Sequence, residues 1–263
     1  MVEKRISHFS LDEILKSGQC FRMRELEKGI FEIINKDRCL LAKQEGDRVC
    51  FYCEEEEFSS IWESYFDLDQ DYEVYIQKAD DKDVYLQNAI HMASGVRILR
   101  QDLWEMIVSF LISQQNNIVR IRKCIQNLCK AYGEKKGNYY AFPTPQALAD
   151  LEEDALKECN LGYRSKYVVR SAKMIKEGQV DLEKIKTLPY EEAKQELLKL
   201  FGVGVKVADC VCLFGLHHLE AFPIDTHIKQ ALDAHYKKGF PRKRYQGFEG
   251  VIQQYIFYYE LHK

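Results

Sequence analysis

The spacing of apolar residues changes once along the chain, and this change limits the folds that the chain can adopt. Between about residues 20 and 53 the apolar runs are short and strand-like, at 31–34, 39–42 and 49–53, with turn-forming residues between them. From about residue 80 onward they recur every three or four positions, which is typical of amphipathic helices. We therefore predict an α+β protein, with an N-terminal antiparallel β domain at 1–82 and an all-helical domain at 83–263.

One helix of the second region should lie at its centre. Asp102 can cap a helix that runs from Leu103 to Ser113, and the apolar residues of this segment surround the helix axis. The following segment has a single apolar stripe, made by Ile118, Ile121, Ile125, Leu128 and Tyr132. The first helix should therefore be buried on all sides, and the second on one side.

The overall composition argues against a generally basic nucleic-acid-binding protein, a membrane-spanning protein and a disulfide-rich protein. The 263 residues carry a net charge of −3, so any nucleic-acid-binding surface must be a local patch. No apolar run reaches the ~20 residues of a membrane helix, and residues 1–10 do not resemble a signal peptide. Nine scattered cysteines indicate a reducing compartment rather than a disulfide framework. The isolated Cys50–Cys53 pair lacks the second pair of ligands that is typical of zinc sites.

The segment from Leu200 to Cys210 carries the strongest functional signal. Gly202-Val203-Gly204 interrupts two helical patterns, and two glycines in three residues permit a close backbone approach. The N–H groups at the start of the second helix would then face outward, where they can bind a phosphate. An ordinary tight turn between helices is the alternative, and the flanking helices with the lysine that follows favour DNA binding.

Lys206 lies near the start of this second helix. A positive helix end disfavours a cation, although a solvated surface lysine tolerates it. A lysine that must act as a neutral amine benefits from the same position, because nearby positive potential lowers the pKa of an amine. Cys210, four residues later, shares its helix face.

Asp225 is the second candidate for a chemical role. It precedes a helix-like segment from Thr226 to Tyr236, which its side chain can cap. Capping alone would explain this residue. It also lies 19 residues after Lys206, which leaves room for one helix and a returning loop. A lysine and a carboxylate at adjoining helix ends would suit nucleophilic attack with charge stabilisation.

Several further segments, together with the hairpin, match the motifs of one known family. They are Ser17-Gly18-Gln19-Cys20-Phe21-Arg22, residues 95–102, residues 116–120, residues 161–164 and residues 206–210. Together with the hairpin at residues 201–206, they resemble the 8-oxoguanine DNA glycosylase family of the helix-hairpin-helix (HhH-GPD) superfamily, in the family's order and over nearly the whole chain. The resemblance implies an antiparallel β domain followed by a helical domain with two lobes.

The resemblance also implies residue roles. Lys206 would be the covalent nucleophile and Asp225 the catalytic aspartate. The pocket for the damaged base would comprise the carbonyl of Gly18, the sandwiching pair Cys210 and Phe257, and Gln253 at the base edge. Gly202, Gly204 and His227 would contact DNA phosphates. A buried core position is the alternative for Phe257, and a solvated or capping position is the alternative for His227.

A second group would read the base opposite the lesion. Arg120 and Arg164 match the family's cytosine-reading arginines, and plain phosphate contacts are the alternative for both. Tyr163 matches its aromatic wedge. The remaining members are Gln115, Asn116 and Asn117. The sequence departs from the family at three places: Gln115 replaces asparagine, Phe201 replaces proline, and Glu260 replaces aspartate.

The implied activity is removal of 8-oxoguanine, and of formamidopyrimidine, from duplex DNA opposite cytosine, followed by strand cleavage through a lysine Schiff base and β-elimination. We expect no metal or cofactor, no membrane partner, and a monomer bound to damaged double-stranded DNA. The short chain favours a bacterial, cytoplasmic protein associated with the nucleoid, or a nuclear one if the source is eukaryotic. A glycosylase for another damaged base, or a non-catalytic DNA-binding module, are the alternatives.

Overall fold

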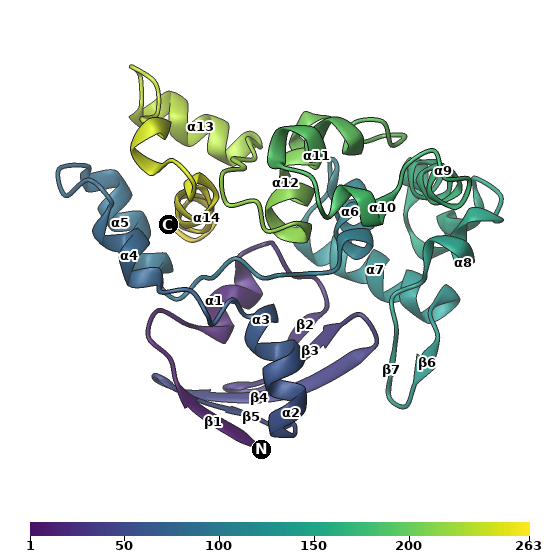
Figure 1. Ribbon diagram of the computed structural model, residues 1–263, viewed down its shortest axis with the longest axis horizontal. Helices are drawn as coiled ribbons and strands as arrows, with labels where there is room; N and C mark the ends of the chain where they lie inside the picture. Colours follow the sequence, from purple (N-terminus) through teal and green to yellow (C-terminus); the bar gives the residue numbers. More distant parts are fainter. The chain divides into compact units, whose positions relative to one another are not determined.

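The computed structural model describes residues 1–263, which form two compact units. Unit 1 comprises Met1–Ile33, Leu40–Arg100 and His217–Lys263, and unit 2 comprises Ile34–Cys39 and Gln101–Leu216. The first unit therefore combines the N-terminal sheet with the last helices of the chain (Figure 1). The division that the sequence predicts between residues 82 and 83 stays a prediction.

The sheet has five strands in the order β1-β5-β4-β3-β2. The strands are β1 (Val2–Arg5), β2 (Met23–Glu27), β3 (Ile30–Asn35), β4 (Arg38–Glu45) and β5 (Arg48–Phe51). The three predicted strands correspond to β3, β4 and β5. The edge strands β1 and β2 escaped prediction because each buries only one residue, Val2 or Met23, and therefore lacks an alternating apolar pattern. The antiparallel sheet before a helical region confirms the expected fold class.

Alternating side chains of the central strands form one core. The inward residues are Phe31, Ile33, Leu40, Ala42, Val49 and Phe51, and each is at most 2% exposed. They pack with Phe58, Trp62 and Phe66. Phe58 and Trp62 lie in a continuous helical stretch, formed by α2 (Glu55–Glu57), the π turn η1 (Phe58–Trp62) and α3 (Glu63–Tyr65), and Phe66 directly follows α3. Helix α1 (Leu11–Lys16) adds Leu11 and Ile14. The three apolar runs that were predicted as strands therefore supply one buried face of the sheet.

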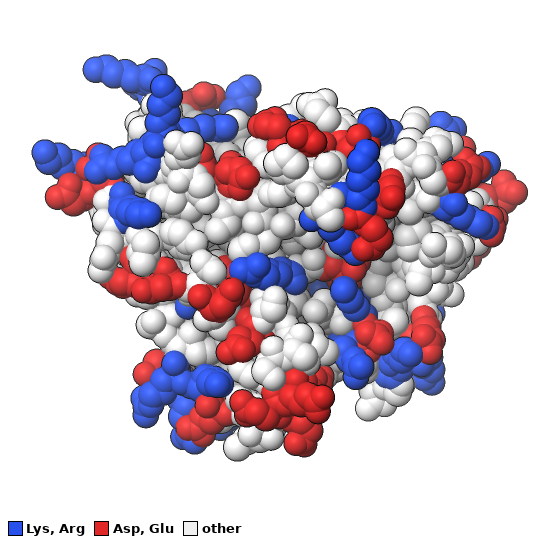
Figure 2. Space-filling model, viewed as in Figure 1, with Lys and Arg blue, Asp and Glu red and all other residues white.

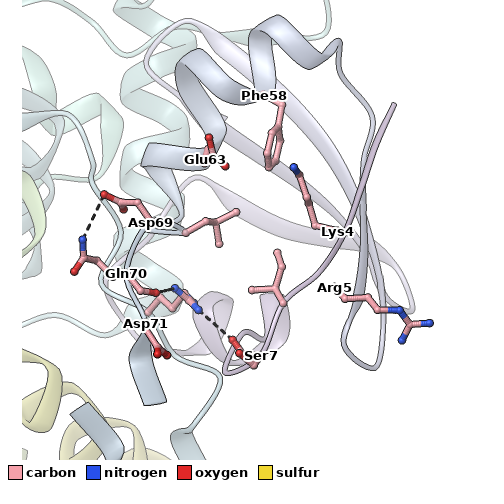
Figure 3. Close-up of a pocket in the computed structure, with 11 residues that line it drawn as sticks. Lys4, Arg5, Ser7, Phe58, Glu63, Asp69, Gln70 and Asp71 are labelled. Atoms are coloured by element: carbon pink, nitrogen blue, oxygen red, sulfur yellow. Dashed lines mark hydrogen bonds between the residues drawn. The ribbon is translucent and has the colours of Figure 1, made fainter. Parts of the chain in front are cut away.

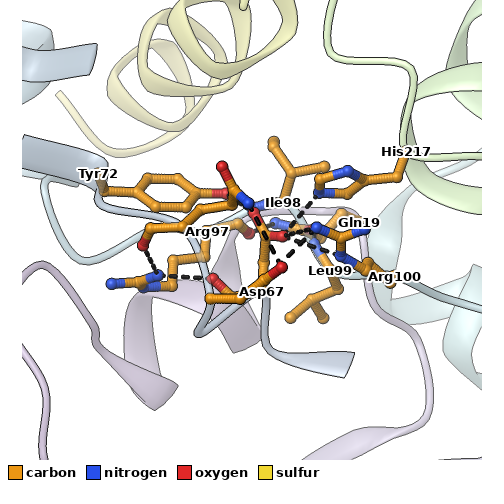
Figure 4. A network of polar contacts seen from close by, with 10 residues as sticks. Gln19, Asp67, Tyr72, Arg97, Ile98, Leu99, Arg100 and His217 are labelled. Carbon is orange, nitrogen blue, oxygen red and sulfur yellow. Dashed lines mark hydrogen bonds and ion pairs between the residues drawn. The ribbon is translucent and has the colours of Figure 1, made fainter. Parts of the chain in front are cut away.

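A buried polar network connects residues 97–100, the last residues of unit 1 before Gln101, to the rest of unit 1 (Figure 4). Arg97 is 3% exposed and donates hydrogen bonds to four backbone carbonyls, those of residues 7, 8, 67 and 70. Gln19 donates to the carbonyl of Arg97 and accepts from the N–H of Leu99. The Ser-Gly-Gln motif and the motif at residues 95–102 thus interact with each other, which gives both a structural role.

Asp67 is the carboxylate at the centre of this network. Burial raises the pKa of Asp67, but the contacts with His217, Tyr72 and Arg100 outweigh it, and the pKa lies below its ordinary value. His217 Nε2 lies 3.2 Å from Asp67 Oδ1, and Arg100 Nη2 lies 2.7 Å from the same oxygen. Asp67 therefore holds residues 100 and 217, where the chain leaves unit 1 and returns to it.

The remaining helices of unit 1 surround its C-terminal helix. They are α4 (Tyr72–Gln77), α5 (Val84–Ala93), α13 (Thr226–His235), η4 (Arg242–Tyr245) and α14 (Glu249–His262). Helix α14 packs against α5, α13 and η4 (Figure 1). Residues 250–256 and 258 are buried on all sides of α14, so its apolar content serves the core.

Unit 2 is built around α6 (Leu103–Ser113), in which residues 103–112 are all buried. The central buried helix is thereby confirmed, including its cap, in which Asp102 accepts from the N–H of Glu105. The other elements of unit 2 are α7 (Ile118–Tyr132), β6 (Lys135–Lys136), β7 (Tyr139–Tyr140), α8 (Pro145–Ala149), η2 (Ala155–Cys159), η3 (Gly162–Arg164), α9 (Ser165–Lys176), α10 (Leu182–Ile185), α11 (Tyr190–Leu197) and α12 (Val205–Gly215). No helix of the protein combines the length and the apolar character needed to cross a bilayer.

Candidate active site

The predicted hairpin is present in unit 2. Helix α11 ends at Leu197, a tight turn follows, and α12 begins at Val205 with Gly204 as its N-cap. No side chain caps this helix end, and a Cβ atom at Gly204 would meet nothing within 4 Å. Its first N–H groups are therefore available to a ligand, as the phosphate-binding interpretation requires.

Gly202 is needed for the shape of the turn. Its φ of +87° suits glycine, and a Cβ atom there would lie 2.6 Å from the ring of Tyr167. Ser171 Oγ donates to the carbonyl of Phe201, and Gln114 Nε2 donates to that of Gly202. The turn is thus held by side chains from two neighbouring segments, which orient the start of α12.

Lys206 occupies the first turn of α12 and is partly exposed. Its Nζ lies 5.4 Å from the centre of the Phe110 ring, and it forms no ion pair. Cys210, one turn later, is 4% exposed. No carboxylate holds the Lys206 amine in an ion pair, so the amine stays accessible to a substrate, as a nucleophile requires.

Asp209 lies in the motif at residues 206–210, and its contacts show that it has a structural role. It accepts a hydrogen bond of 2.6 Å from the hydroxyl of Tyr190 and lies 2.7 Å from Lys194 Nζ. Burial and the Asp209 charge raise the pKa of Tyr190 well above its ordinary value, so the phenol keeps its proton and remains a donor. These contacts fasten α12 to α11. The spacing of Tyr190 and Lys194, four residues apart on one helix face, is the signal that could have revealed them.

The turn between α6 and α7 carries three of the predicted opposite-base residues. Gln115 has a φ of +49°, which is strained for a residue other than glycine, and the Arg164 side chain stabilises this turn through hydrogen bonds. Arg164 is 4% exposed; its Nε donates to the carbonyl of Gln114, and its Nη2 donates to the carbonyls of both Gln114 and Gln115. The role of Arg164 in reading cytosine stays a prediction, and no local sequence pattern indicates this supporting role.

The other residues of this group lie around the same turn. The residue Tyr163 is 42% exposed, and its hydroxyl donates a hydrogen bond of 3.3 Å to Gln115 Oε1. Asn117 Oδ1 caps α7 by accepting from the N–H of Arg120, and the Arg120 side chain is exposed. Asn116 Nδ2 donates to the carbonyl of Ile112. The structure therefore brings together all six residues that were predicted to read the opposite base.

Asp225 is located in unit 1 as the N-cap of α13. Its Oδ1 accepts from the N–H of Ile228 at 2.8 Å, so the expected cap is confirmed. The other carboxylate oxygen, Oδ2, has no hydrogen-bond partner in the structure. His227 is exposed, and its ring lies 6.1 Å from that of Phe257. Capping thus occupies one oxygen of Asp225 and leaves the other available.

Three predicted base-pocket residues lie on or beside α14. Gln254 Nε2 donates to the carbonyl of Ser17 and thereby holds the Gly18 turn against this helix. Gln253 is 4% exposed; its Nε2 donates to the carbonyl of Pro223, while its buried Oε1 has no partner. Phe257 is partly exposed between buried neighbours. Phe257 is therefore not a pure core residue, and Gln253 offers an unused acceptor.

The predicted site residues are thus divided between the units. Lys206, Cys210, the two hairpin glycines and the opposite-base group belong to unit 2. Gly18, Asp225, His227, Gln253 and Phe257 belong to unit 1. Each unit assembles its own part of the predicted site.

A separate pocket of about 360 Å³ opens in unit 1 beside β1 (Figure 3). Its lining includes Lys4, Phe58, Asp69 and Arg97, and none of the predicted site residues. The guanidinium of Arg97 is occupied by backbone carbonyls, so it serves the fold there. No group of three or more His, Cys, Asp or Glu side chains could hold a metal ion.

Two family models match consecutive parts of the chain. Residues 1–107 match the N-terminal domain of 8-oxoguanine DNA glycosylase, and residues 108–244 match HhH-GPD superfamily base excision DNA repair proteins. The chain belongs to the 8-oxoguanine DNA glycosylase family of the HhH-GPD superfamily. The resemblance found in the sequence motifs is therefore confirmed.

Solved and curated relatives agree with this assignment. One solved relative is the 8-oxoguanine glycosylase/lyase of Clostridium acetobutylicum, in complex with double-stranded DNA that contains cytosine opposite 8-oxoguanine. It is 38% identical to this chain, with a TM-score of 0.90. The match covers 98% of this chain and 96% of that one. An N-glycosylase/DNA lyase of Saccharomyces cerevisiae is 35% identical over 54% of this chain, and a probable N-glycosylase/DNA lyase of Methanothermobacter thermautotrophicus is 28% identical over 73%. The alignments cover 42% and 71% of these two relatives, so the chain spans less than half of the yeast protein.

Proposed function

We propose that the protein is a bifunctional DNA glycosylase and AP lyase, which removes 8-oxoguanine from duplex DNA opposite cytosine and acts as a monomer. The observation that carries this proposal is Lys206: a partly exposed lysine without an ion pair, in the first turn of the hairpin's second helix. The relatives named N-glycosylase/DNA lyase and the Clostridium complex with DNA support the same activity.

The reaction begins when the damaged nucleotide leaves the base stack, which costs a few kcal/mol. Lys206 Nζ, as a neutral amine, forms a bond to C1′ while the bond from C1′ to the base breaks, and the base leaves with a proton. Asp225 stabilises the positive charge that develops on the sugar. The sugar ring then opens to a Schiff base, with the ring oxygen O4′ taking up a proton. Loss of a proton from C2′ to a general base then breaks the C3′–O bond, which expels the 3′ phosphate and cuts the strand.

Recognition of the lesion rests on the N7 position. Guanine N7 accepts hydrogen bonds, whereas N7 of 8-oxoguanine carries a proton and donates. The carbonyl of Gly18 would accept from the lesion and repel guanine, and leaving such a group unpaired costs about 1–3 kcal/mol. The unpartnered Oε1 of Gln253 supports this pocket, because a buried acceptor without a donor fits the N–H groups of a base edge.

The direct test uses duplexes that carry a panel of damaged bases, treated with borohydride during the reaction. We expect base release and a covalent protein–DNA product with 8-oxoguanine opposite cytosine, since borohydride reduction links the protein to DNA only where a Schiff base joins them. Release without trapping would indicate a monofunctional glycosylase. Binding without release would indicate a DNA-binding module, and a preference for alkylated bases would assign a different lesion.

Replacing Arg120 with methionine should flatten the preference for cytosine while activity opposite cytosine remains. Cytosine presents two adjacent acceptors to arginine, whereas adenine presents an N6 donor that repels it. Single-turnover rates on duplexes with each of the four opposite bases measure this effect.

Lys123, an exposed cation on the same helix, gives the matched control variant Lys123→Met. This control should keep the wild-type preference. A uniform loss of activity across all four partners in Arg120→Met would show that Arg120 contacts only phosphate.

A further inference from the structure

The segment that follows α13 concentrates positive charge in an acidic protein. Residues 237–244, here called the basic loop, read Lys-Lys-Gly-Phe-Pro-Arg-Lys-Arg, with five cations and no acidic residue, whereas the whole chain carries −3. All five of these side chains are exposed. Figure 2 shows Lys and Arg gathered on this face where the chain continues beyond α13 in Figure 1. This patch was not recognised in the sequence analysis.

The basic loop is anchored to the core of unit 1 by aromatic contacts. The ring of Phe240 lies 5.3 Å from that of Phe222, 4.9 Å from Tyr236 and 5.5 Å from Tyr245. The N–H of Gly239 donates to the carbonyl of Tyr236 at 2.8 Å. The loop backbone is therefore folded against the core, and a partner needs to order less of the chain on binding.

Most of its charge is not neutralised within the protein. Arg244 pairs with Asp80, whereas the other four cations form no ion pair. Arg242 lies over the ring of Phe222 at 4.5 Å, which leaves its charge uncompensated. Of the neighbouring carboxylates, Asp83 already caps α5 and accepts from the hydroxyl of Tyr236. The exposed Asp81 and Asp233 do not pair with the loop. An anionic partner therefore suits this surface.

The position of the loop along α13 points to the partner. Asp225 and His227 lie at the N-terminus of this helix, and the basic loop follows its C-terminus. Ten helical residues at 1.5 Å each separate them by about 15 Å. On a duplex that runs alongside α13, where one strand carries a phosphate every 3.4 Å along the axis, this length spans about four base pairs.

We propose that the basic loop is a second DNA-backbone contact, which holds phosphates about four base pairs from the nucleotide at Asp225. It would bind without reading sequence, because its cations face phosphates and not base edges. The proposal rests on the proposed function in one respect: Asp225 must mark the position of the lesion.

The test is the salt dependence of duplex binding by the variant K237Q/K238Q/K243Q. Each lost phosphate contact should reduce the slope of log K against log salt concentration by about 0.9, so the slope becomes shallower by about 2–3 and affinity at low salt falls about tenfold or more. The control K28Q/K130Q/K135Q removes the same charge at exposed positions elsewhere and should match the wild type. An unchanged slope in K237Q/K238Q/K243Q would overturn the proposal.

Duplex length tests the location of the contact separately. A duplex with ten base pairs on each side of the lesion should bind wild type more tightly than one with three, and the loop variant should lose this difference. Equal losses on both duplexes would contradict the assigned distance. Base release at saturating enzyme should be unchanged in the loop variant. Undamaged duplex gives the salt slopes even if the wild type releases no base, so failure of the proposed activity is distinguishable from failure of the loop proposal.

Discussion

Replacing Lys206 with glutamine is expected to abolish base release and borohydride trapping, while binding to lesion-containing DNA remains near the wild-type level. The amide keeps most of the length and bulk of the side chain but cannot form an imine. Because Lys206 makes no ion pair in the structure, its loss should also leave the fold intact. Trapping yield, single-turnover release and an equilibrium binding curve measure the three parts of this prediction.

Lys199 supplies the matched control. It lies just before the hairpin, is exposed, and pairs with Glu196 on the surface, a contact of small energetic value. The Lys199→Gln variant should trap DNA like the wild type. Normal trapping by Lys206→Gln would show that another amine is the nucleophile.

Replacing Asp225 with asparagine is expected to slow catalysis by roughly 10²-fold or more, which is the scale of losing one well-placed electrostatic group. The amide oxygen can still accept from the N–H of Ile228, so the α13 cap should survive. Thermal unfolding should therefore remain close to that of the wild type. Single-turnover rates and a melting curve on the same preparation measure both effects.

Asp71, the exposed N-cap of α4, provides the comparison for the capping effect alone. Its asparagine variant should match the wild type in both rate and melting temperature. If Asp225→Asn melts much earlier yet keeps its rate per folded molecule, Asp225 would be a cap and no more.

The elements that could be predicted are those that residues close together in the sequence determine. The short apolar runs at residues 31–34, 39–42 and 49–53 were visible without a structure, and they supply the buried face of the sheet. The hairpin was equally visible, because glycines and a helix start are short-range signals. The caps at Asp102 and Asp225 were found for the same reason.

The elements that were missed depend on partners far away in the sequence. The edge strands β1 and β2 exist because the central strands offer them hydrogen bonds, and their own residues are mostly charged. Arg97, likewise, is explained only by carbonyls up to 90 residues away. No local pattern contains this information.

The sequence by itself determined the family, the succession of a strand-rich region and a helical region, and the residue types available for chemistry, because motifs and periodicity are properties of neighbouring residues. Only the tertiary structure decided how those residues are used. It places the Arg164 guanidinium against the carbonyls of residues 114 and 115, and it pairs Asp209 with Tyr190 and Lys194. It also gathers the cations of residues 237–244 on an aromatic support. The physical reason is that hydrogen bonds, ion pairs and ring contacts form between atoms that are close in space, and folding alone brings such atoms together.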